Sequence, residues 1–71
     1  MSKLKCAVIG LGMGTSHIKG YQGHPEAEVV AIVDLNEDLL KSKGDEFGIP
    51  GRYTSVDEMF EKEKIDIVSI A

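Results

Sequence analysis

The chain has 71 residues, of which 42% are apolar and 28% charged, and its formal net charge is −4. This length allows at most one small domain, and the acidic balance argues against nucleic acid as a partner, because nucleic-acid-binding surfaces are basic. A single cysteine excludes an internal disulfide and favours a reducing, cytoplasmic location, and no apolar run is long enough to cross a membrane.

A short apolar run over residues 4–9 predicts a buried strand that ends at Gly10. Cys6 lies within this run, and we interpret it as a buried small hydrophobe rather than a reactive thiol. A helical pattern follows over residues 13–21, and Pro25 lies beyond its end. A second apolar run without alternation, over residues 28–33, predicts a strand covered on both faces.

The next segment predicts a helix with a clear beginning and end. Asn36 is a good N-cap, and Gly48 lies where a left-handed C-terminal cap is expected. Between them, the apolar residues Leu39, Leu40 and Phe47 share one helical face.

The last third of the chain predicts a strand, a helix and a further strand. Residues 52–54 form a short strand, and residues 65–71 form an apolar one. Between these strands, Ser55 and Glu58 have the spacing of a capping box. The helix that it opens has an apolar face made of Val56, Met59 and Phe60.

Strands therefore alternate with helices along the whole chain, which predicts an α/β fold with a parallel sheet and right-handed crossovers. We expect a Rossmann-like sheet with strand order 3-2-1-4. The first two helices would cover one face and the third helix the other. The sheet would be incomplete at its fourth strand, whose apolar residues lie at an open edge.

The glycine-rich stretch from Gly10 to Gly14 is the main chemical signal. Gly10 permits a sharp turn from strand into helix, and Gly12 would let the backbone approach a diphosphate closely. The free N–H groups at the start of the helix form an anion site. Asp34 closes the second strand, 20 residues after Gly14. Its carboxylate can accept hydrogen bonds from both ribose hydroxyls of a dinucleotide and would repel a 2′-phosphate. Asp34 therefore favours NAD as the cofactor, with NADP as the other possibility.

The glycine spacing departs from the usual dinucleotide pattern, which would place the third small residue at position 15. Either Gly14 takes that role in a shorter loop, or Thr15 packs there and donates its hydroxyl to a phosphate. The literal spacing also occurs in S-adenosylmethionine-dependent methyltransferases. Those proteins usually carry an acidic residue where this chain has Val8, so the methyltransferase interpretation is less favoured.

The remaining polar residues carry weaker signals. His17 could face the cofactor, although a helix-surface role is more common for such a residue, and His24 is expected in a solvated loop. No cluster of His, Cys, Asp and Glu has metal-binding spacing, so we assign no metal site. No general acid or base for hydride transfer is present either, so we assign no catalytic residue.

Over nearly its whole length the chain resembles the N-terminal region of the glucose–fructose oxidoreductase, inositol dehydrogenase and rhizopine-catabolism (Gfo/Idh/MocA) family. The matching segments are 7–14 with His17 after them, 30–34, 47–50, 53–55 and 65–71. The resemblance implies an NAD(P)-dependent oxidoreductase that moves a hydride between a nicotinamide and a sugar, polyol or related small molecule. It also implies a cytoplasmic homo-oligomer.

The same resemblance assigns the cofactor contacts. It implies that the diphosphate is bound by Gly10, Leu11, Gly12, Met13 and Gly14, that Asp34 holds the adenosine ribose, and that Ile70 and Ala71 lie near the cofactor. The family's later Glu-Lys-Pro segment and its substrate domain do not occur in these residues. We therefore expect residues 1–71 to be the N-terminal part of a dinucleotide-binding domain, without the catalytic and substrate domain. The alternative is a non-catalytic nucleotide-binding or interaction module.

Overall fold

The computed structural model describes residues 3–70, and for residues 11–16 it describes the backbone only. Strands and helices alternate in the order β1 (Leu4–Ile9), α1 (Leu11–Gln22), β2 (Ala27–Val33), α2 (Glu37–Phe47), β3 (Gly51–Tyr53), α3 (Val56–Lys62) and β4 (Ile67–Ile70). The strands form one sheet in the order β3-β2-β1-β4, and every neighbouring pair is parallel. The α/β class and the strand order predicted from the sequence are confirmed.

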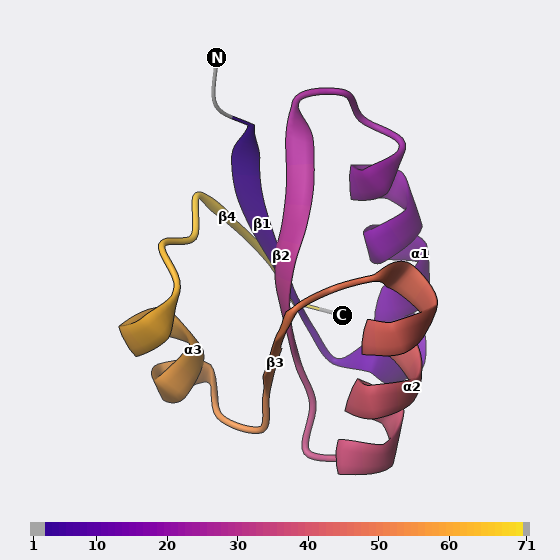
Figure 1. Ribbon diagram of the computed structural model, residues 1–71, viewed down its shortest axis with the longest axis vertical. Helices are drawn as coiled ribbons and strands as arrows, with labels where there is room; N and C mark the ends of the chain where they lie inside the picture. Colours follow the sequence, from indigo (N-terminus) through magenta and orange to yellow (C-terminus); the bar gives the residue numbers. More distant parts are fainter. Residues whose placement is uncertain (1–2, 71) are drawn as a thin grey trace.

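The helices cover both faces of the sheet, as predicted (Figure 1). Helices α1 and α2 lie on one face, and α3 lies on the other. The larger core cluster joins β1 and β2 to α1 and α2, and its buried members are Cys6, Val8, Ile18, Ala27, Val29, Ile32, Leu40 and Ile49. The smaller cluster joins the opposite face to α3, and its buried members are Ala7, Ala31, Val33 and Met59.

Strand β2 carries one irregularity, which changes which of its residues face each of the two cores. In the pairing with β1, Cys6 lies opposite Val29, but Ala7 lies opposite Ala31, so Val30 is an extra residue. An extra residue reverses the alternation of side chains along a strand. Val29 therefore belongs to the larger cluster and Ala31 to the smaller one.

The predicted helix caps of α2 and α3 are confirmed. The Asn36 side chain accepts a hydrogen bond from the N–H of Leu39, and Gly48 adopts φ 66°, ψ 37° at the C-terminal end of α2. The Ser55 side chain accepts a hydrogen bond from the N–H of Glu58. The Glu58 carboxylate, however, forms an ion pair with Lys62 at 3.3 Å along the same helix.

Several element boundaries differ by one or two residues from the sequence-based prediction. Helix α1 ends one residue later than predicted, β2 begins one residue earlier, and β3 is shifted by one residue toward the N-terminus. Helix α1 begins at Leu11 rather than at residue 13, because Gly10 alone makes the turn out of β1. Strand β4 begins at Ile67 rather than at residue 65. Just before β4, Asp66 forms two hydrogen bonds with Lys5 of β1. The N–H of Asp66 donates to the carbonyl of Lys5 at 2.8 Å, and the carboxylate of Asp66 accepts from the N–H of Lys5 at 2.8 Å.

The predicted apolar face of α3 is partly wrong. Met59 is fully buried and Val56 packs against the smaller core, but the Phe60 side chain is 50% exposed. Helix α3 has only seven residues, and Met59 is its one buried residue, with Val56 packed against the same core. The prediction of a buried Cys6 is confirmed, and burial raises the pKa of its thiol.

Helices that have the length and apolar character of a membrane span do not occur within residues 3–70.

Candidate functional site

The turn between β1 and α1 depends on Gly10. Its backbone adopts φ 88°, ψ 94°, a conformation that residues with a side chain rarely adopt. Its N–H donates a 2.9 Å hydrogen bond to the carbonyl of Val33, the last residue of β2. Helix α1 begins at the next residue. The turn therefore points the first N–H groups of α1 toward the carboxyl ends of the central strands.

The N-terminus of α1 differs from those of the other two helices. Helices α2 and α3 each have a side-chain cap, at Asn36 and Ser55, and two acidic residues in their first turns. Helix α1 follows a glycine, which has no capping side chain, and its first turn contains no acidic residue. Because the N-terminal N–H groups of a helix attract negative charge, this end suits an anion supplied from outside the chain.

Asp34 follows β2 directly, next to this turn. Its N–H donates to the carbonyl of Tyr53 at 3.1 Å, which extends the pairing of β2 with β3 by one step. Its carboxylate oxygen Oδ1 accepts a hydrogen bond from the N–H of Asn36 at 2.9 Å. The residue is partly buried. These contacts fix the position of the carboxylate at the end of the sheet.

A cleft of about 290 Å³ opens between the turn, Asp34 and the loop after β3. It is lined by Ile9, Gly10, Val33, Asp34, Leu35, Thr54 and Val56. These residues come from the carboxyl ends of β1, β2 and β3, where ligands bind in open α/β sheets. Most of the lining is apolar, and Leu35 at its rim is 88% exposed.

The structure brings Gly10 and Asp34 together, as the sequence predicted, because both line this cleft. The predicted contacts of Leu11, Gly12, Met13, Gly14 and Thr15 fall where only the helical backbone is described, so their side chains lie outside the described residues. Ile70 pairs with Ile9 in the sheet but is 77% exposed and does not line the cleft. Ala71 lies outside the described residues.

Five cleft residues were not identified from the sequence, namely Ile9, Val33, Leu35, Thr54 and Val56. Each is the last residue of a predicted strand or lies two residues after it, and that position was the signal that could have identified them. The side chains of His17 and His24 are exposed, and the Nδ1 atom of His24 accepts a hydrogen bond from the N–H of Glu26. Among the described residues, no group of three or more His, Cys, Asp and Glu side chains could hold a metal ion.

Residues 4–71 match the model of an oxidoreductase family described by its NAD-binding Rossmann fold. The chain belongs to this family. It is the Gfo/Idh/MocA family that the sequence motifs resemble. The match covers the whole sheet, so the fold is the family's NAD-binding Rossmann fold.

Individual relatives agree with this assignment. The chain is 32% identical to a D-apiose dehydrogenase of Paraburkholderia graminis, over all of this chain and 19% of that protein. It is 34% identical to an oxidoreductase of Agrobacterium radiobacter crystallised with NAD+, L-tartaric acid and magnesium, with a TM-score of 0.88 over 99% of this chain and 21% of that one.

A myo-inositol 2-dehydrogenase of Lactobacillus plantarum is also similar to the chain. The two are 29% identical, with a TM-score of 0.88 over 99% of this chain and 21% of that one. The chain thus spans about a fifth of the length of the relatives that it matches.

Proposed function

We propose that this chain binds the adenosine and diphosphate part of NAD at the carboxyl ends of β1 and β2. The observation that carries the proposal is the meeting of two features at one cleft: the Gly10 turn, which leads into the N-terminus of α1, and the carboxylate of Asp34. Membership of a family with an NAD-binding Rossmann fold supports it and favours it over the methyltransferase alternative.

The residues present fit the three parts of this ligand. The diphosphate would lie against Gly10 and the N–H groups of residues 11–15, where no capping side chain from Gly10 competes for them. The ribose hydroxyls would donate to Asp34. The adenine would enter the apolar cleft beside Leu35 and Val56. Ile70 and Ala71 would lie toward the nicotinamide end.

The carboxylate of Asp34 would favour NAD over NADP. A ribose with two free hydroxyls can donate to it, whereas a 2′-phosphate would place like charges side by side. The residues that follow, Leu35 and Asn36, supply no cation that could offset this repulsion.

We further infer that residues 1–71 are the N-terminal part of the dinucleotide-binding domain of a longer, homo-oligomeric oxidoreductase. That protein would transfer a hydride between the nicotinamide and a sugar, polyol or related substrate. The relatives, named as dehydrogenases of D-apiose and myo-inositol, support this substrate class. The catalytic groups and the substrate contacts would come from the rest of that longer protein.

Calorimetric titration of the whole protein with NAD and with NADP tests the cofactor assignment. We expect tighter binding of NAD, by about tenfold, because one like-charge contact or one lost charged hydrogen bond is worth about 1.5 kcal/mol. Equal or reversed affinities would overturn the assignment. A whole protein that binds NAD but oxidises no sugar or polyol would leave the cofactor site standing and overturn the substrate class.

A further inference from the structure

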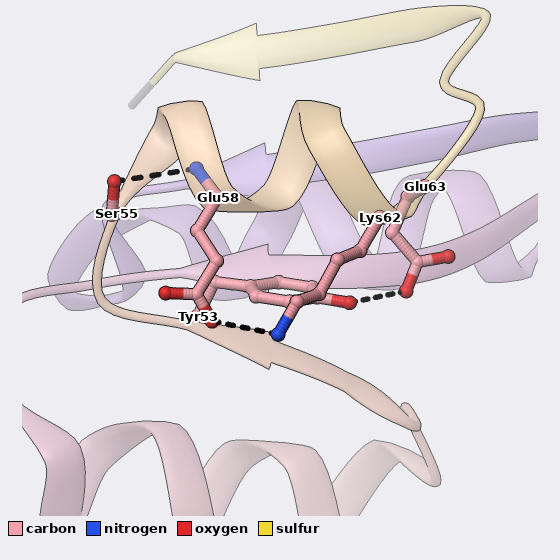
Figure 2. A network of polar contacts seen from close by, with 5 residues as sticks. All are labelled: Tyr53, Ser55, Glu58, Lys62 and Glu63. Atoms are coloured by element: carbon pink, nitrogen blue, oxygen red, sulfur yellow. Dashed lines mark hydrogen bonds and ion pairs between the residues drawn. The ribbon is translucent and has the colours of Figure 1, made fainter.

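A short hydrogen bond joins the two ends of the segment that forms one wall of the cleft. The hydroxyl of Tyr53, at the end of β3, donates to Oε2 of Glu63 at 2.6 Å (Figure 2). Glu63 follows α3 directly, and its own N–H donates to the carbonyl of Met59 at 2.8 Å. The hydrogen bond from the Tyr53 hydroxyl to the Glu63 carboxylate raises the pKa of Tyr53 to about 12. The bond therefore closes residues 53–63 into a loop.

Glu63 is also fitted closely to β3. A methyl group built on Gly51 would lie 2.8 Å from the Glu63 carboxylate oxygen Oε2 and 2.5 Å from the carbonyl oxygen of Val30. Gly51 and Tyr53 are two apart along β3, so both face the side of the sheet that α3 covers. The carboxylate thus lies over Gly51 and reaches the Tyr53 hydroxyl from there.

Tyr53 also contacts the opposite wall of the cleft through its backbone. Its carbonyl accepts the hydrogen bond from the N–H of Asp34 at 3.1 Å. The residues after it, Thr54 and Val56, line the cleft, and Ser55 between them caps α3 through the N–H of Glu58 at 3.3 Å (Figure 2). Tyr53 is therefore the residue at which the Asp34 wall and the 54–56 wall meet.

We propose that Tyr53 and Glu63 are positioning residues for the cofactor cleft, which set the place of the 54–56 wall relative to Asp34. This inference rests on the proposed function, since it assigns the pair a part in binding the adenosine end of NAD. Neither side chain lines the cleft itself. Their effect would pass through the backbone of residues 53–56 and through the Asp34 N–H.

The matched control is the other tyrosine. The hydroxyl of Tyr21 is hydrogen-bonded to the Ser69 hydroxyl, also in a partly buried setting, but from α1 on the opposite face of the sheet. Replacing either tyrosine by phenylalanine removes one hydroxyl and one hydrogen bond. Only Tyr53→Phe removes a bond that holds the cleft wall.

The experiment compares Tyr53→Phe, Glu63→Gln and Tyr21→Phe in the 71-residue chain. Amide hydrogen exchange is measured by NMR at Asp34, Met59 and Glu63, whose N–H groups donate to the carbonyls of Tyr53, Ser55 and Met59, together with the Kd for NAD. We expect Tyr53→Phe to accelerate exchange at these amides and to raise the Kd, each about fivefold, as the loss of one typical hydrogen bond predicts. Glu63→Gln should give a smaller change, because its amide oxygen still accepts from the Tyr53 hydroxyl. Tyr21→Phe should leave both quantities unchanged.

Two results would overturn the positioning role. One is unchanged exchange at Asp34, Met59 and Glu63 in Tyr53→Phe. The other is an equal change in Tyr53→Phe and Tyr21→Phe, which would show a general loss of stability. If the unsubstituted chain shows no binding of NAD at any concentration, the proposed function fails. The exchange pattern would then still decide whether the pair holds the 54–56 wall against Asp34.

Discussion

The N–H of Gly10 donates a 2.9 Å hydrogen bond to the carbonyl of Val33, so the turn out of β1 is joined to the residue immediately before Asp34. This bond continues the pairing of β1 with β2 past the last ladder residues, Ile9 and Val33. It places the start of α1 and the Asp34 carboxylate together at the carboxyl ends of the two central strands. Gly10, which leads into a helix N-terminus that favours anions, and Asp34, whose carboxylate accepts hydrogen bonds from hydroxyls, thus line one cleft.

Replacing Gly10 by alanine should disrupt this arrangement. With φ at 88° and ψ at 94°, a side chain at this position is strained, and we expect Gly10→Ala to lower the free energy of unfolding by about 1–3 kcal/mol. Gly20→Ala is the control, since Gly20 lies in α1 and a methyl group there has no atom within 4 Å. It should stabilise the chain by up to about 1 kcal/mol, because alanine favours helix. Urea denaturation of both variants checks this, and equal effects would contradict the strained turn.

Replacing Asp34 by alanine should narrow the preference for NAD over NADP. The variant loses a charged acceptor for the ribose hydroxyls, so its affinity for NAD should fall about tenfold or more. It also loses the charge that repels a 2′-phosphate, so its affinity for NADP should stay the same or rise. Asp45→Ala removes the same charge from the far part of α2, where Asp45 pairs with Arg52 at 2.9 Å. Calorimetry on the whole protein measures the ratio of the NADP and NAD affinities in each variant. A preference unaffected by Asp34→Ala would show that this carboxylate does not select the cofactor.

Local sequence patterns predicted the parts of the fold that depend on neighbouring residues. Asn36 and Gly48 bound α2 because side-chain capping and a left-handed glycine act within one helical turn. The parallel sheet followed from the alternation of strands and helices, and its strand order from the doubly wound arrangement that this alternation suggested. Gly10 and Asp34 could be placed together for the same reason, since both follow parallel strands that are neighbours in the sheet.

Features that depend on distant segments could not be predicted in this way. Phe60 is half exposed whereas Met59 beside it is buried, and helical spacing alone does not tell which side of α3 packs against the sheet. The cleft wall at Thr54 and Val56 depends on β3 lying next to β2. The Tyr53–Glu63 hydrogen bond joins residues ten positions apart across a helix, and no pairing rule for helices or strands links them.

The close fit of Gly51 gives a further prediction about stability. A methyl group there would overlap the backbone carbonyl of Val30 at 2.5 Å as well as the Glu63 carboxylate, so β3 would have to move. We expect Gly51→Ala to cost about 1–3 kcal/mol through overpacking. Gly48→Ala meets no atom within 4 Å, and its cost should come only from the positive φ of 66°. Amide hydrogen exchange near Asp34 distinguishes the two variants, because only Gly51→Ala should accelerate this exchange.

The Tyr53 hydroxyl makes the free energy of unfolding depend on pH in the alkaline range. Its pKa is raised to about 12 in the folded chain, chiefly by the hydrogen bond to Glu63, whereas an unfolded tyrosine has a pKa of about 10. The folded chain therefore holds this proton more tightly, and the stabilisation is fully present below about pH 10 and is lost as the pH rises through about 12. Tyr53→Phe should flatten this part of the curve of unfolding free energy against pH. Curves of equal slope for the variant and the unsubstituted chain would contradict the assignment.

The most direct test of the proposed cofactor site is an NMR titration of the isotope-labelled 71-residue chain with NAD, followed by the same titration with NADP. We expect weak binding, with amide shifts concentrated at residues 10–15, 34–35 and 54–56, and larger shifts for NAD than for NADP at equal concentration. A second hollow of about 300 Å³, lined by Leu4, Gly20, Tyr21, His24, Ala27 and Ile67, lies at the opposite ends of the strands. Shifts concentrated there, or shifts at the cleft that are equal for the two nucleotides, would contradict an NAD site built on Gly10 and Asp34.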